Sequence, residues 1–147
     1  MSRCDDYSAI QATLARYSTA LDQRDWPLLE RVFTPDLVYD AGEWTTHSFE
    51  KYLERLRPYL EGCGPTQHLL GNYRIELDGD EARSAVYIRA LHVGARELSQ
   101  TTYEMFGEYR DQLCRTPEGW RSRHRSLRLD FELGSREVLR PAPPDAR

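Results

Sequence analysis

The hydrophobic pattern of this chain changes its period at Thr66. Before that residue, apolar side chains recur every three or four positions, and after it they alternate with polar side chains almost to the end of the chain. The first pattern is typical of amphipathic helices and the second of half-buried strands. Because the helices come first and do not alternate with the strands, we predict an α+β domain, with N-terminal helices packed inside a strongly curved, mainly antiparallel sheet.

Three helices are expected in the first part of the chain. Apolar residues at helical spacing between Ile10 and Leu21 mark an amphipathic helix of about four turns. Asp25 is placed to cap a short second helix, and a third helix over 49–62 is expected to fade after Pro58. A short strand over 37–40 lies between the last two helices.

Four long strands are expected in the second part, separated by turn segments rich in Gly, Asp and Pro. The alternating segments run over 67–77, 82–93, 101–115 and 120–133. The chain shows neither an internal repeat nor a domain boundary. We therefore expect one domain over residues 1–133 and an irregular, proline-rich tail over residues 134–147.

Two histidines stand in neighbouring predicted strands. The even-numbered residues of 82–92 share one face, which is small and mostly apolar until it reaches His92, so this imidazole is expected to face inward. Whether His68 meets it depends on the loop between the strands. A two-residue loop over 78–79 would pair His68 with Arg89 and put the rings on opposite faces, whereas a three-residue loop over 78–80 would pair His68 with Ala90 and put both rings on one face. We predict the second register, or a bulge with the same effect.

Asp22 lies on the flank of the apolar stripe of the first helix, and periodicity alone does not single it out over Asp25. A carboxylate between helix and sheet is costly unless it is paired, and an imidazole is its natural partner. Such a pair has the logic of an acid/base dyad, because the carboxylate fixes the tautomer while the other ring nitrogen takes a proton from a substrate.

Less specific explanations exist for the same residues. A single histidine in a strand is usually a core or surface residue, and His47 and His124 fit that description. Two histidines and a carboxylate are also a possible ligand set for a metal, but no His-x-Asp or His-x-x-x-His spacing supports it. We therefore expect no metal.

Composition excludes several classes of protein. The formal net charge of −4 argues against a nucleic-acid partner, although Arg121, Arg123 and Arg125 occupy alternate positions and are expected to project from one face of the last strand. The three cysteines include no Cys-x-x-Cys pair, which favours a reducing compartment over a disulfide framework. Neither a membrane-spanning run nor a signal-peptide core is present, so we expect a cytoplasmic protein without a membrane partner.

Three stretches resemble one known family when they are read together. They are ARYSTALDQRDWPLLERVFTPD, GPTQHLLGNYRIELDGDEARSAVYIRALH and GEYRDQLCRTPEGWRSRHRSL. Their order and spacing, over roughly residues 10–131, are similar to those of the SnoaL-like family, which includes scytalone dehydratase and polyketide cyclases. The resemblance implies a cone-shaped α+β barrel with a deep apolar pocket, no cofactor, and a homo-oligomer, either a trimer or a dimer.

The resemblance also implies roles for three residues. Asp22 matches the family's helix aspartate, His68 its catalytic histidine, and His92 the second histidine, which the aspartate orients. Two tyrosines that hold a water against the substrate carbonyl in scytalone dehydratase are replaced here, by Leu21 and Ala41. That carbonyl-activating device is therefore expected to be missing.

Other side chains are candidates for contacting a substrate. Tyr17, Tyr39, Asn72 and Tyr103 are candidate replacements for the missing hydrogen bonds, and the sequence does not choose among them. The arginines of the last strand are expected to cover the outer face of the sheet or a subunit contact, through ion pairs with Glu104, Glu108 or Asp111. In the alternative, Arg125 reaches the mouth of the pocket and holds an anionic group of the substrate.

The resemblance favours a cofactor-independent lyase, and in particular a dehydratase of a polycyclic polyketide-like or terpenoid substrate. His68 would remove a proton next to a carbonyl, and a β-hydroxyl would leave with a proton returned by His68 or His92. An isomerase or an aldol-type cyclase could use the same residues. A domain that only binds a small apolar or amphipathic molecule is the alternative outside the enzyme class.

Overall fold

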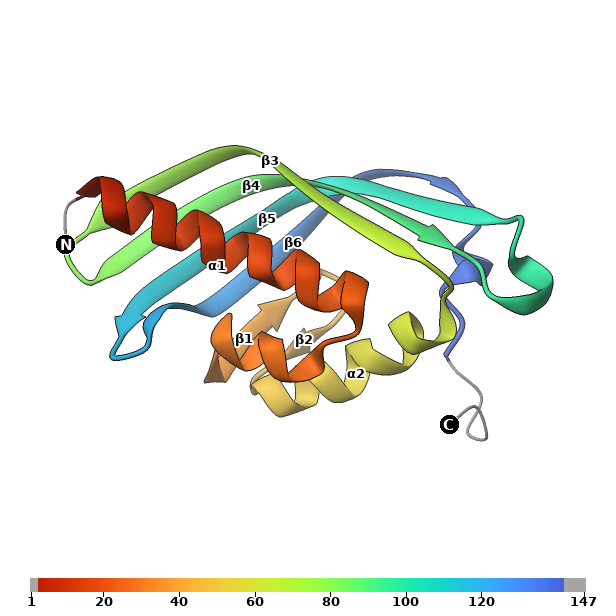
Figure 1. Cartoon of the computed structure of the whole chain (residues 1–147), viewed down its shortest axis with the longest axis horizontal. Coiled ribbons are helices and arrows are strands. Elements are labelled where there is room, and N and C mark those ends of the chain that lie inside the picture. Colours follow the sequence, from red (N-terminus) through yellow and green to blue (C-terminus); the bar gives the residue numbers. More distant parts are fainter. Residues whose placement is uncertain (1–2, 142–147) are drawn as a thin grey trace.

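The computed structural model describes residues 3–141 as helices packed on one side of a long, curved sheet (Figure 1). The elements, in chain order, are α1 (Arg3–Gln23), η1 (Trp26–Arg31), β1 (Phe33–Asp40), β2 (Thr45–Thr46), α2 (Phe49–Gly62), β3 (Thr66–Asp78), β4 (Glu81–Val93), η2 (Arg96–Leu98), β5 (Thr102–Thr116), β6 (Gly119–Gly134) and η3 (Arg136–Val138). The predicted α+β class and the order of helices before strands are confirmed.

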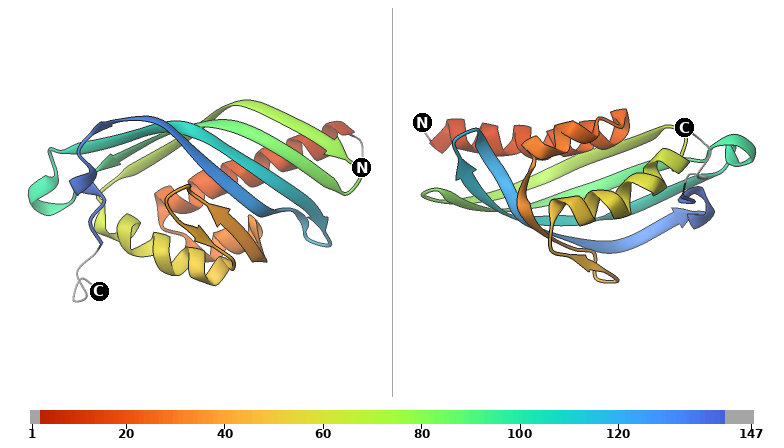
Figure 2. Two further views of the ribbon diagram at one scale, coloured as in Figure 1. Left: turned by 180° about the vertical axis from the view of Figure 1, so that it is seen from behind. Right: turned by 90° about the horizontal axis from the view of Figure 1, so that it is seen from below.

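The sheet has the strand order β2-β1-β6-β5-β4-β3. All neighbouring strands are antiparallel except β1 and β6, which pair in parallel. The sheet curves around α1 and α2 without closing, because β2 and β3 remain its two edges (Figure 2). It is therefore an open cone and not a closed barrel.

The helices form where the sequence indicates. The apolar stripe of α1, from Ile10 to Leu21, is at most 1% exposed because it packs on the concave face of the sheet. Asp25 accepts a hydrogen bond from the backbone N–H of Leu28 (3.3 Å) and caps η1, a 3-10 helix. The expectation that the third helix fades after Pro58 is wrong, since α2 continues unbroken to Gly62.

The turn between β3 and β4 differs from the predicted one. It contains two residues, Gly79–Asp80, with Asp78 opposite Glu81. If this register continued unchanged, it would place His68 opposite Leu91. His68 would then point to the convex face of the sheet, away from the helices.

A bulge in the middle of β3 reverses this outcome. The register shifts between Gly71 and Arg74, where β3 has one residue more than β4. Asn72 lies in the bulge with a φ of 51°, a left-handed conformation that asparagine tolerates better than most residues. Beyond the bulge His68 lies opposite Ala90, so the predicted register is confirmed, although a bulge and not a three-residue loop produces it.

The end of the described chain is ordered and packs against the fold. Val138 in η3 is 1% exposed, and its carbonyl accepts a hydrogen bond from the Cys63 thiol at 3.3 Å. The expectation of an irregular tail does not hold for 136–138, and residues 142–147 lie outside the described residues.

Candidate functional site

A cavity of about 450 Å³ lies between the concave face of the sheet and the helices. Its walls are mainly apolar and aromatic, with contributions from α1, α2 and the long strands. His68 and His92 both line it, and their rings meet edge to face with centroids 5.3 Å apart. The predicted convergence of the two imidazoles inside one apolar hollow is confirmed.

Asp22 joins this pair from the last turn of α1. One carboxylate oxygen, Oδ1, lies 2.7 Å from His68 Nδ1, and the other, Oδ2, accepts a hydrogen bond from the His68 backbone N–H at 2.9 Å. An ionised carboxylate only accepts hydrogen bonds, so Nδ1 carries the proton in this contact. Nε2 of His68 then keeps its lone pair, which is what a general base requires.

Two residues that the sequence analysis missed hold Asp22 in place. The Thr66 hydroxyl donates to Asp22 Oδ1 at 2.9 Å, and Arg24 donates to Thr66 Oγ1 at 2.8 Å and to the Gly64 carbonyl at 2.9 Å. The alternation of β3 contained the signal for Thr66, because residues 66 and 68 share a face. Arg24 has a positive φ of 57° directly after α1, which no periodicity indicates.

The electrostatics of Asp22 depend on these donors. Burial raises the pKa of the carboxyl, but the hydrogen bonds from the His68 ring and backbone and from Thr66 outweigh it, together with attraction to His68, and the pKa is lowered from its ordinary 3.8. The C-terminal end of a helix disfavours a negative charge. The carboxylate is therefore ionised at neutral pH because its partners, and not the helix, stabilise it.

His92 differs from His68 in its surroundings. Burial, followed by repulsion from His68, lowers the pKa of His92 from 6.5 to about 4, although a hydrogen bond to the Tyr103 backbone acts in the opposite direction. Its Nδ1 is buried without a partner among the described residues. The expectation that Asp22 orients His92 is wrong, since the carboxylate contacts His68 instead.

The predicted substrate-contacting residues divide into two groups. Tyr17, Tyr39 and Tyr103 line the cavity. The Tyr103 hydroxyl already donates to Glu132 at 2.9 Å. Asn72 is exposed in the β3 bulge and does not line the cavity, so its predicted place is wrong.

Arg125 is not at the mouth of the cavity either. A register shift between Gln112 and Leu113 turns its side chain inward, where it is 0% exposed and donates from Nε to Asp111 Oδ1 at 2.8 Å. The expected common face with Arg121 and Arg123 is therefore also wrong. Asp111 was one of the acidic residues expected to pair with these arginines on the outer face, and it pairs with Arg125 on the inner face instead.

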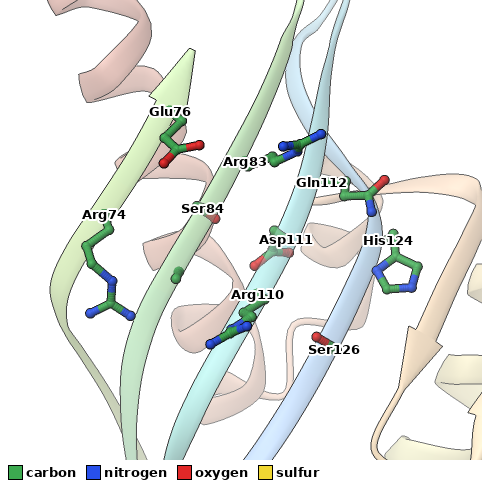
Figure 3. A pocket seen from close by; sticks show the side chains of 10 residues that line it. Arg74, Glu76, Arg83, Ser84, Arg110, Asp111, Gln112, His124 and Ser126 are labelled. Carbon is green, nitrogen blue, oxygen red and sulfur yellow. The ribbon is translucent and has the colours of Figure 1, made fainter. Parts of the chain in front are cut away.

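A second hollow lies on the convex face of the sheet (Figure 3). Arg74, Arg83 and Arg110 extend into it from three neighbouring strands, and Arg74 and Arg110 both pair with Glu108. Most of the residues that line it are charged or polar, and neither His68 nor His92 is among them. The concave cavity is therefore the candidate site.

The structure also bears on metal sites and membrane-spanning helices. Within residues 3–141, no group of three or more His, Cys, Asp or Glu side chains is arranged to hold a metal ion. In the same part of the chain, no helix combines the length and apolar character needed to cross a membrane.

The sequence of this chain is similar to those of known proteins. The sequence model described as "SnoaL-like domain" matches residues 2–126. Uncharacterized proteins of Mycobacterium tuberculosis and Mycobacterium bovis are 35% identical over 123 residues, which is 82% of this chain and 83% of theirs.

Solved structures share the fold at low identity. A Novosphingobium aromaticivorans protein provisionally named a scytalone dehydratase superposes with a TM-score of 0.81 and 23% identity, over 98% of this chain and 95% of its own. A hexachlorocyclohexane dehydrochlorinase from Novosphingobium barchaimii gives 0.78 and 16%, over 96% and 97%. At these identities the likeness establishes the fold alone.

Proposed function

We propose, from the premise that this chain belongs to the family of SnoaL-like domains, that it is a cofactor-independent acid/base lyase acting on a small organic molecule. The observation that carries the proposal is the Asp22–His68 pair at the wall of an apolar cavity. The names of the structural relatives, a dehydratase and a dehydrochlorinase, support an elimination reaction.

His68 is the base in this scheme. Its Nε2 takes a proton from a carbon of the bound molecule, and Asp22 stabilises the imidazolium that forms. The electron pair of the broken C–H bond forms the double bond, and the leaving group departs with its bonding electrons. For a β-hydroxyl, the proton on His68 passes to the departing oxygen, so that water is released and the base is regenerated.

His92 acts as a neutral hydrogen-bonding group. With a pKa of about 4 the ring is not an imidazolium near neutral pH and has no readily released proton, and we therefore assign the returned proton to His68. His92 lines the same cavity as His68, and as a neutral imidazole it would exchange a hydrogen bond with a substrate hydroxyl there.

A dehydratase of a polycyclic polyketide-like or terpenoid β-hydroxy ketone is the form of this proposal that we favour. Isomerisation and aldol-type ring closure would use the same proton transfer, but they conserve the mass of the substrate, whereas dehydration loses water. The predicted homo-oligomer also stays a prediction.

The proposal is tested by incubating the protein with a panel of β-hydroxy ketones and measuring products by mass spectrometry. The wild type should release water from at least one of them, and His68→Gln should lower that rate about a hundredfold or more. His47→Gln, at an exposed histidine, is the matched control and should keep the full rate. Undiminished turnover by a folded His68→Gln variant would contradict the proposal, and tight binding without any product would favour a carrier.

A further inference from the structure

Three tyrosine hydroxyls meet beside the cavity. Tyr17 from α1 lies 2.9 Å from the Tyr52 hydroxyl of α2 and 3.5 Å from the Tyr109 hydroxyl of β5. All three side chains are at most 3% exposed, and Tyr17 and Tyr109 line the cavity together with both histidines. We call these three residues the phenol cluster.

Counting protons shows that the phenol cluster has a spare donor. Each hydroxyl has one proton, so the cluster has three protons but only two oxygen–oxygen contacts among its own members. Tyr17 also hydrogen-bonds the Tyr39 phenol, which adds one proton and one contact, so one proton is still spare. The Tyr17–Tyr109 contact, at 3.5 Å, is also at the limit of a hydrogen bond and costs little to give up. If Tyr39 and Tyr52 both donate to Tyr17, the Tyr17 proton and that of the third phenol of the cluster are free to point into the cavity.

A buried cation lies against the same two rings. The Arg125 guanidinium is 4.2 Å from the ring centroid of Tyr17 and 4.6 Å from that of Tyr109. Its Nε pairs with Asp111, and its side chain is 0% exposed, so its charge acts on the rings without screening by water. A positive charge in this position favours negative charge building up on or beside the phenol oxygens.

The Tyr109 phenol remains protonated near neutral pH. Burial raises the pKa of Tyr109 well above its ordinary 10.0, and a further contribution comes from Tyr17, while Arg125 acts in the opposite direction. Tyr109 can therefore donate a hydrogen bond at any pH near neutrality.

We infer that Tyr17 and Tyr109, backed by Arg125, form an oxyanion site that binds the carbonyl oxygen of the substrate and the enolate oxygen that develops from it. The inference rests on the proposed function and narrows its substrate class to carbonyl compounds. Two donors about 3.5 Å apart can both reach one oxygen atom. Tyr17 and Tyr109 would thus bind the carbonyl oxygen in place of the two tyrosines of scytalone dehydratase, which Leu21 and Ala41 replace here.

The phenols and the base face one space, since Tyr17, Tyr109 and His68 all line the cavity. A carbonyl compound bound there would contact the phenols through its oxygen and His68 through a neighbouring C–H. His68 would remove the proton of that C–H while the phenols stabilise the charge on the oxygen.

The test uses 4-nitrophenol, whose ionised form mimics an enolate and has its own visible absorbance. Titration of the wild type at several pH values gives the dissociation constants of the neutral and ionised forms. We expect the ionised form to bind more tightly. Tyr17→Phe and Tyr109→Phe should each weaken its binding about tenfold or more, because each removes a hydrogen bond to a charged oxygen. Tyr87→Phe, on the exposed convex face, should change binding less than about twofold.

Several outcomes would overturn the inference. They are absence of binding by the wild type, tighter binding of the neutral form, or unchanged affinity in both phenylalanine variants. Loss of nitrophenolate binding in His68→Gln, with none in the tyrosine variants, would place the oxygen at the histidine instead. The wild-type comparison of the two forms holds even if a variant fails to fold. Turnover by His68→Gln tests the proposed function separately, so the two can fail independently.

Discussion

Acid should destabilise this protein through His92, and the size of the effect follows from its pKa. The imidazole has an ordinary pKa of 6.5 and a pKa of about 4 in the folded protein. Between these values the unfolded chain binds a proton that the folded protein does not bind, so stability falls as the pH falls. From about pH 7 to about pH 4.5, the loss from this one group amounts to about 2 kcal/mol.

The comparison that isolates this loss is urea unfolding of the wild type and of His92→Gln at both pH values. Glutamine does not titrate, so the variant should lose about 2 kcal/mol less than the wild type over the same interval, whatever its stability at neutral pH. Asp22 and the other carboxyl groups are present in both proteins, so their own contributions to the pH dependence cancel in this comparison. His47→Gln, at an exposed position, should follow the wild type. Equal losses in the wild type and His92→Gln would refute the assignment of a buried, neutral imidazole.

Three further outcomes follow from the structure. Asp22→Asn should lower turnover about a hundredfold or more, because an amide cannot stabilise the imidazolium of the dyad; a rate within about threefold of the wild type would contradict this role. Asn72→Val should lower the free energy of unfolding by about 1 kcal/mol more than Asn72→Gly, since a branched side chain is strained at a φ of 51°; urea unfolding of the two variants measures the difference, and equal stabilities would argue against the bulge. Arg125→Met should cost about 3 to 5 kcal/mol by leaving Asp111 buried and unpaired, and Arg125→Met with Asp111→Leu should recover most of that loss, whereas a harmless single variant would show that the pair is solvated.

The sequence predicted the fold because each element is locally consistent. The stripe of α1 and the inward face of β4 are both buried as their periods indicate. Asp25 caps η1 through its own side chain. Periodicity and helix capping involve residues that are close together in the chain, so they can be recognised in the sequence alone.

The site was predicted less completely because it depends on two register shifts. A bulge at Asn72 turns His68 inward, and another, where Arg123 is the extra residue of β6, buries Arg125. One extra residue reverses every later side chain of a strand, and single-strand alternation does not locate the extra residue. The sequence also could not show which histidine Asp22 contacts, because that depends on how the helix lies against the sheet. In the structure the carboxylate contacts His68 and not His92.

The central claim is that His68, held by Asp22, removes a proton from carbon. Its most direct test is deuterium incorporation from heavy water into the carbon next to the carbonyl of a cyclic ketone, followed by mass spectrometry, because exchange needs only the base and no leaving group. The wild type should exchange faster than the buffer, and His68→Gln should fall to the buffer rate. Equal exchange by the wild type and a folded His68→Gln variant would contradict the claim.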